Sequence, residues 1–204
     1  KLEKVSEAGD FNKYDESNTK REFIEPLFAA LGWDIYNKSA KSDDLKDVKS
    51  EKDASKGRVD YALRINGITK FFLEAKPLKA NLDDQKWAGQ VIDYAWHKGI
   101  TWAVLTDFKG LKIFNAEKKA RDPRESRYLE FKYDEYITEF DRLWQLSKES
   151  FESGLMDREA EKVGRKDKKT PVNELIFKDL LGWRDELIKN VKERNRDLTE
   201  EQVH

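Results

Sequence analysis

Residues 59–76 read VDYALRINGITKFFLEAK, two apolar segments on either side of an Asn-Gly pair. Segments rich in β-branched and aromatic residues predict strands, and Asn66-Gly67 between them predicts a hairpin. Asp60 opens the first segment, while Glu74 and Lys76 close the second. The hairpin therefore carries two carboxylates and an amine at one end. Such a group can hold a divalent ion and orient a water, the minimum equipment for hydrolysing a phosphodiester.

The length of the turn decides whether these side chains share a face of the hairpin. A strict two-residue turn would point Glu74 away from Asp60, because side chains alternate along a strand. A three-residue loop at 65–67, a type I turn followed by a glycine bulge, pairs Tyr61 with Phe71 instead. We therefore predict that bulged loop, or a bulge elsewhere in the hairpin. The residues then placed on one face are Asp60, Phe72, Glu74 and Lys76.

Charge suggests a role for each member of the group. Asp60 and Glu74 are candidate ligands of Mg²⁺, which prefers carboxylate oxygens and keeps several waters. The backbone carbonyl of Ala75 is a candidate third ligand. Lys76 would orient or help deprotonate the attacking water and stabilise charge in the transition state. The alternative is a surface strand end with an incidental Glu–Lys pair, and the spacing alone does not choose between them.

The composition limits the classes of protein to consider. The 204 residues suffice for one well-buried domain with an added helical segment. Lys and Arg total 40 against 41 Asp and Glu, so the formal charge is -1. A domain that binds DNA by itself is more often clearly basic. If this chain acts on DNA, either its basic residues cluster on one face or, as we favour, another part of a larger protein binds the DNA.

Other residue types argue against several kinds of site. The chain has no cysteine, and its two histidines are His97 and His204, so a zinc site or a Ser-His-Asp triad is not expected. No apolar run approaches a membrane span, and no secretory signal opens the chain. The first residue is Lys rather than Met. We therefore expect a fragment of a soluble, cytoplasmic protein that has no contact with membranes.

Periodicity predicts the elements around the hairpin. A helix is expected over 16–31, capped by Asp15 or Ser17 and by Gly32, with a late start or a kink at Pro26. The apolar residues of 31–36 are expected to lead into a first strand. The further expected elements are a loop or polar edge strand within 38–57, a helix over 84–98, strands over 100–106, 111–114 and 127–131, helices from 133 to 151, a basic linker over 161–170 and a helix over 172–195. This order predicts an α/β fold with a mixed sheet.

The pattern Asp60…Glu74-Ala75-Lys76 resembles the PD-(D/E)xK nuclease signature, with Val59 where that family often has proline. Five flanking segments are similar to the N-terminal nuclease domains of single-chain type IIG restriction–modification enzymes, and to the related domains of type I motor subunits. These segments are 16–20, 23–28, 31–34, 90–94 and 102–107. Residues 133–136 and 181–195 are similar to the connector that leads to an adenine-methyltransferase domain in such enzymes.

The resemblance implies a restriction-endonuclease-like core, ordered αβββαβ, over residues 1–132, and a helical extension over 133–204. It implies a catalytic set of Asp60, Glu74 and Lys76, supported by Gln90 and Tyr94 on the following helix. Glu16 would bind the metal through water or hold Lys76, and Glu22 is a rival that is more simply a solvated acid. For Gln90 and Tyr94 the alternative is a tyrosine packed on the sheet beside an incidental glutamine.

The implied function is a Mg²⁺-dependent endonuclease, with Mn²⁺ as a possible substitute, that cuts double-stranded DNA and leaves 5′-phosphates. The implied partners are DNA and the remainder of a restriction–modification polypeptide, with its methyltransferase and specificity domains. A transient dimer on DNA is a further hypothesis, because one active site cuts one strand at a time. Two alternatives stay open, the nuclease domain of an ATP-dependent type I motor subunit and a catalytically silent module of the same fold.

Overall fold

The computed structural model describes residues 2–50, 59–118 and 122–163, together with residues 180, 182–184, 186–191 and 194. The described residues form a mixed sheet in the order β1-β2-β3-β4-β5-β6. Strands β3 and β4 are parallel, and the other neighbouring strands are antiparallel. The strands are β1 (Val48–Ser50), β2 (Tyr61–Ile65), β3 (Ile68–Ala75), β4 (Trp102–Thr106), β5 (Gly110–Asn115) and β6 (Arg127–Lys132).

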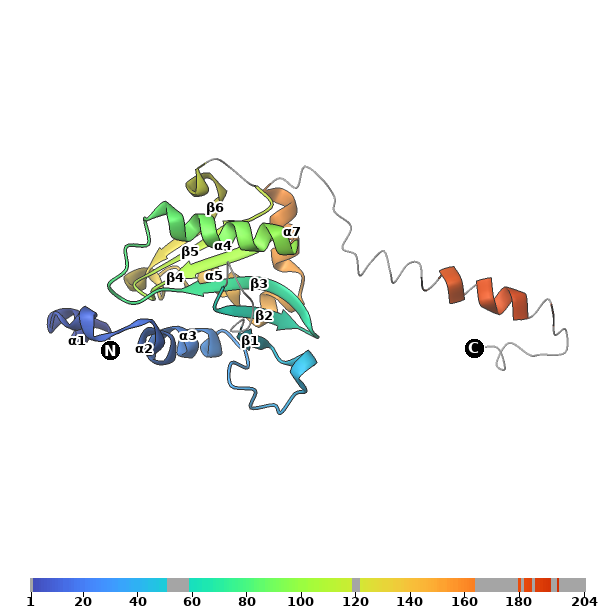
Figure 1. Ribbon diagram of the computed structural model, residues 1–204, viewed down its shortest axis with the longest axis horizontal. Helices are drawn as coiled ribbons and strands as arrows, with labels where there is room; N and C mark the ends of the chain where they lie inside the picture. The colour runs from blue at the N-terminus through green and yellow to red at the C-terminus, as the bar shows by residue number, and fades with distance from the viewer. Residues whose placement is uncertain are drawn as a thin grey trace. The chain divides into compact units, whose positions relative to one another are not determined.

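Helices cover both faces of this sheet (Figure 1). Helix α4 (Gln85–Lys98) forms the crossover between β3 and β4 and packs on one face, over Ala62, Phe72 and Ala103. The other face packs against α3 (Glu25–Ala30), α5 (Phe140–Leu143), α6 (Lys148–Glu152) and α7 (Leu155–Lys162). The remaining helical segments are α1 (Leu2–Glu7), α2 (Glu16–Thr19), η1 (Asp10–Lys13), η2 (Lys20–Ile24), η3 (Asp43–Leu45), η4 (Pro123–Ser126), η5 (Tyr133–Glu135) and η6 (Trp144–Leu146). The predicted α/β fold, a restriction-endonuclease-like core with the order αβββαβ, is confirmed.

The helix predicted over 16–31 is formed by α2, η2 and α3 in succession. Asp15 caps its start, accepting a hydrogen bond from the backbone of Asn18 at 2.8 Å, and Gly32 follows its end at φ 91°. The interruption expected at Pro26 takes the form of a π turn at η2, immediately before the proline. Because proline lacks an N–H and clashes with the preceding turn, a widened turn at this place accommodates it.

The prediction that the apolar residues of 31–36 lead into a first strand is wrong, because turns follow them. Trp33 is buried in the core and donates its indole N–H to the carbonyl of Leu146 at 2.8 Å. The carboxylate of Asp34 accepts from the backbone of Lys38 and Ser39, which closes a turn there instead. The first strand is β1, a short polar edge strand as predicted within 38–57, and residues 51–58 lie outside the described part of the chain.

The helices after residue 132 form as predicted, broken into short pieces. Their apolar side chains join the main core, which includes Tyr136, Leu143 and Phe151. One compact unit extends from Lys1 to Arg165 and a second from Lys166 to His204. Most of the linker expected over 161–170 and of the helix expected over 172–195 lies outside the described residues. Their use as a connector stays a prediction. No helix within the described ranges has the length and apolarity to cross a membrane.

Candidate active site

The β2–β3 hairpin turns through two residues, Asn66 at φ 50° and Gly67 at φ 80°, so that Ile65 pairs with Ile68. The predicted three-residue loop is therefore wrong, and so is the predicted pairing of Tyr61 with Phe71. The pairing shifts farther along the hairpin, since Arg64 opposes Thr69 whereas Leu63 opposes Phe71. Lys70 is the extra residue of this bulge. The alternative that we predicted, a bulge elsewhere in the hairpin, is confirmed.

The contacts of Arg64 hold the tight turn in this form. Its guanidinium donates to the carbonyl of Gly67 at 2.7 and 3.1 Å and to the carbonyl of Asp44 at 2.9 Å. Its backbone N–H donates outside the hairpin, to the carbonyl of Asp47 at 2.6 Å. The contacts with Asp44 and Asp47 are available because the loop before β1 lies against the hairpin.

The bulge determines which residues meet at the far end of the hairpin. Tyr61 pairs with Leu73, and the preceding residue, Asp60, donates its backbone N–H to the carbonyl of Leu73 at 3.1 Å, so that it lies at the end of β3 beside Glu74. Asp60 Oδ2 accepts the backbone N–H of Ala75 at 2.7 Å, which fixes the carboxylate beside the end of β3. Asp60, Phe72 and Glu74 thus share the face that carries α4. The predicted single-face arrangement forms, with a different turn from the one that we expected.

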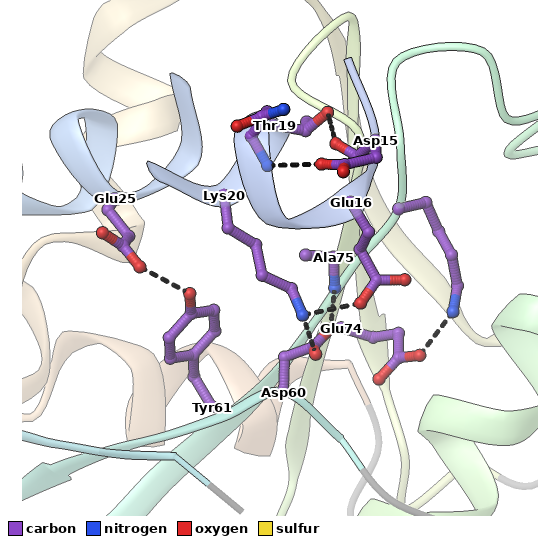
Figure 2. Close-up of polar contacts among 11 residues, drawn as sticks. Asp15, Glu16, Thr19, Lys20, Glu25, Asp60, Tyr61, Glu74 and Ala75 are labelled. Carbon is purple, nitrogen blue, oxygen red and sulfur yellow. Dashed lines mark hydrogen bonds and ion pairs between the residues drawn. The ribbon is translucent and has the colours of Figure 1, made fainter. Parts of the chain in front are cut away.

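Five charged side chains gather at this end of the hairpin, and we refer to them as the charged cluster (Figure 2). They are Glu16, Lys20, Asp60, Glu74 and Lys76. The Lys20 ammonium donates to Asp60 Oδ1 and, at 2.7 Å, to Glu16 Oε1. Lys76 Nζ donates to Glu74 Oε1 at 2.5 Å and lies 4.0 Å from the centroid of the Trp87 ring. The cluster therefore joins three carboxylates and two ammonium groups.

Burial and charge shift two pKa values in the cluster. Only 7% of the Glu74 side chain and 8% of the Lys76 side chain are exposed. Burial raises the pKa of Glu74 to about 7, and the charges of Asp60 and Glu16 act in the same direction against the opposing effect of Lys76. Burial alone would lower the pKa of Lys20, but its bonds to Asp60 and Glu16 outweigh burial and raise it. Carboxylates are in excess, so the cluster favours an added cation.

Glu16 reaches the cluster as predicted, although its ion pair is with Lys20, whereas Lys76 pairs with Glu74. The rival Glu22 forms an ion pair with its neighbour Arg21 at 3.4 Å. Sequence reasoning missed the role of Lys20. The available signal was its place four residues after Glu16, the spacing that brings side chains together on a helix.

The supporting residues predicted on α4 lie on the same side of the sheet as Glu74. The Tyr94 ring packs edge-on against Phe72, with centroids 4.8 Å apart. Gln90 is half-buried one turn earlier on the helix. Trp87 precedes them by a further turn and supplies the ring beside Lys76. The contact of Tyr94 with Phe72 fits the alternative of a tyrosine packed on the sheet, and a catalytic role for Gln90 or Tyr94 stays a prediction.

The donor atoms suit a hard divalent cation. Asp60, just before β2, and Glu74, near the end of β3, present carboxylate oxygens. Ala75, between Glu74 and Lys76 in the chain, offers a backbone carbonyl oxygen. Mg²⁺ prefers oxygen ligands of these kinds. Within the described residues, no group of three or more His, Cys, Asp or Glu side chains is arranged to hold a metal ion. A site here would thus use two carboxylates, a backbone oxygen and water. Asp60 Oδ1 already contacts one cation, the Lys20 ammonium.

The fold is an α/β domain with a mixed six-stranded sheet and flanking helices, as in a restriction-endonuclease-like core. The chain is similar to the type II restriction enzyme and methyltransferase RM.Eco57I of Escherichia coli, with 26% identity over 203 residues. The similarity covers 94% of this chain and 20% of that relative, so the chain spans about a fifth of the relative's length. No protein-family model and no solved structure matches the chain.

Proposed function

We propose that this chain is the Mg²⁺-dependent DNA endonuclease domain of a restriction–modification enzyme, with a PD-(D/E)xK site. The observation that carries the proposal is the placement of Asp60 beside Glu74 at the end of the bulged hairpin, with Lys76 paired to Glu74. The similarity to a restriction enzyme over nearly the whole chain supports the same conclusion. Mn²⁺ is expected to substitute for Mg²⁺.

In this proposal the carboxylates of Asp60 and Glu74 and the carbonyl of Ala75 hold the metal. When bound, the ion polarises the phosphate and favours ionisation of a water. Lys76 is held between Glu74 and the Trp87 ring, where its ammonium can donate to the attacking water and stabilise negative charge on the phosphoryl oxygens. Water adds to phosphorus and the 3′-oxygen leaves, which yields a 5′-phosphate and a 3′-hydroxyl.

The partners follow from the charge and from the length of the relative. A formal charge of -1 gives the domain little affinity of its own for a polyanion. We therefore propose that methyltransferase and specificity domains elsewhere in a longer cytoplasmic polypeptide deliver double-stranded DNA to the site. Two copies would meet transiently on DNA to cut both strands, since the described site has one catalytic set.

Nicking of supercoiled plasmid tests the proposal, both with this chain and with a longer polypeptide that includes a methyltransferase domain. We expect cleavage with Mg²⁺ or Mn²⁺, no cleavage with EDTA, and a loss of about 10²–10³-fold for Lys76→Ala. Lys13→Ala, which removes an exposed partner of Asp10, serves as the matched control. A requirement for ATP would favour a type I motor subunit. Full activity of Lys76→Ala, or no cleavage by the longer polypeptide, would refute the proposed site.

A further inference from the structure

Lys20 belongs to the charged cluster, but the proposed mechanism gives it no task. It begins the π turn η2, and its side chain reaches from that helix to the end of the hairpin. Figure 2 shows its ammonium between the carboxylates of Asp60 and Glu16, with an interaction to each. Only 19% of the Lys20 side chain and 19% of the Asp60 side chain are exposed. This ion pair is therefore partly shielded from water.

The contacts of Asp60 show what the ammonium does there. Asp60 Oδ2 already accepts the backbone N–H of Ala75, so Oδ1 is the oxygen better placed to take a metal. Lys20 contacts that oxygen. A Mg²⁺ ion binds its oxygens at about 2.0–2.1 Å, and an ammonium on the same oxygen would face a double positive charge at close range. The two cations therefore compete for Asp60.

We propose that Lys20 is the resident counter-cation of this site, and that a divalent metal displaces its ammonium from Asp60 on binding. The inference rests on the proposed function, since it takes Asp60 as a metal ligand. In the metal-free protein Lys20 offsets the repulsion among three carboxylates. After displacement its ammonium stays beside Glu16, to which it is joined at the i,i+4 spacing of a helix. Lys20 is thus a positioning residue that sets the metal affinity of the site.

Calorimetric titration of Mn²⁺ into the 204-residue chain, without DNA, tests the competition. We expect Lys20→Met to bind Mn²⁺ about tenfold more tightly than the natural chain, because a like charge beside a partly buried ion is worth about one decade or more. Lys20→Arg keeps the charge and should keep the natural affinity. The control Lys13→Met removes a lysine whose side chain is 72% exposed and should change nothing. An unchanged or weaker affinity in Lys20→Met would overturn the inference.

A measurement on the natural chain covers the case in which Lys20→Met does not fold. The ¹³Cε–¹Hε resonance of Lys20 reports the surroundings of its ammonium during a Mg²⁺ titration. We expect it to move toward its position in metal-free Asp60→Asn, in which Lys20 has lost its charged partner. A Lys20 resonance that stays in place while Mg²⁺ saturates the site would also overturn the inference.

Asp60→Asn separates this inference from the proposed function. If the natural chain binds Mn²⁺ through Asp60 but Lys20→Met shows no gain, the counter-cation role is refuted and the metal site stands. If neither the natural chain nor Lys20→Met binds Mn²⁺, the metal site is refuted and the inference falls with it. If Asp60→Asn loses Mn²⁺ while Lys20→Met gains affinity, both are supported.

Discussion

Two regions of the molecule place lysines around a shielded carboxylate, the charged cluster and the surroundings of Asp47. The Asp47 side chain is 1% exposed and accepts from Lys41 at 2.6 Å and from Lys148 at 2.9 Å. A third bond, at 3.3 Å, comes from the backbone of Asp34. Burial would raise the pKa of Asp47, but these three donors outweigh burial and lower it. In the charged cluster the pKa of Glu74 is raised to about 7.

Burial raises the pKa of Glu74 most strongly, and the two regions differ further in the balance of their charges. One carboxylate meets two ammonium groups at Asp47, whereas three carboxylates share two ammonium groups in the charged cluster. Both carboxylate oxygens of Asp47 already contact a donor. The contacts of Asp47 join the loop before β1 to α6 through the side chain and to β2 through the backbone carbonyl. A cluster with surplus carboxylates is left with capacity for a cation. This contrast separates a structural ion pair from a candidate site made of the same residue types.

Asp60→Asn tests the contrast with the largest expected effect. It should lower the rate of plasmid nicking by at least about 10³-fold, because it removes a proposed metal ligand. It should change the free energy of unfolding by less than about 1 kcal/mol, since Asn can still accept from Ala75 and Lys20 keeps Glu16 as a partner. Urea denaturation measures the second quantity. A severe loss of stability would make Asp60 a structural residue like Asp47.

Asp47→Asn should give the opposite result. It leaves two lysines without their buried partner, so we expect about 3 kcal/mol of destabilisation at pH 7 and an unchanged affinity for Mn²⁺. The folded-state pKa of Asp47 lies below its unfolded value, so its contribution is complete above about pH 4 and is lost as the pH falls through the folded value. Melting temperatures of the two chains should therefore converge toward pH 3. Parallel curves down to that pH would exclude an ionic role for Asp47.

The comparison also shows how much of the site can be predicted from the sequence. The apolar segments of the hairpin and its Asn-Gly pair locate Asp60, Glu74 and Lys76, and alternation along the strands requires a bulge. The sequence does not place that bulge at Lys70, because some of the contacts of Arg64 beside it are long-range, among them the bond to the carbonyl of Asp44, twenty residues away. Local patterns carry little information on such long-range bonds.

The same limit explains the other differences. Lys20 and Glu16 are visible as a helical pair, but the contact of Lys20 with Asp60 spans 40 residues of the chain. The apolar run after residue 31 resembles a strand in isolation. Trp33 instead packs in the core, because its indole N–H finds the carbonyl of Leu146, 113 residues later. Tertiary contacts determine the structure at both places.

Gly67→Ala tests the link between the two regions, because the turn lies against the loop that leads to Asp47. Gly67 has φ 80°, and a Cβ there would lie 2.9 Å from the carbonyl oxygen of Asp44. We expect about 2 kcal/mol of destabilisation, since a strained backbone adds to a close contact with backbone atoms. Gly99→Ala is the matched control, with φ 70° and no atom within 4 Å of the new Cβ. An equal loss in both variants would show that the contact with Asp44 contributes nothing.

Trp87→Leu should have the smallest effect and tests whether the charged cluster also depends on an aromatic ring. Lys76 has a carboxylate on one side and the Trp87 ring at 4.0 Å on the other, whereas the lysines at Asp47 are held by the carboxylate. Leucine keeps an apolar side chain but removes the π face, so the rate of nicking should fall about tenfold, in line with a shielded cation–π contact. Mn²⁺ affinity should not change, because Trp87 is not a proposed ligand.

Two control variants complete the test. Trp87→Phe should recover most of the nicking rate, and Trp96→Leu, near the exposed end of the same helix, should keep all of it. If Trp87→Phe were as slow as Trp87→Leu, the indole would act by its size, and Lys76 would depend on Glu74 alone for its position.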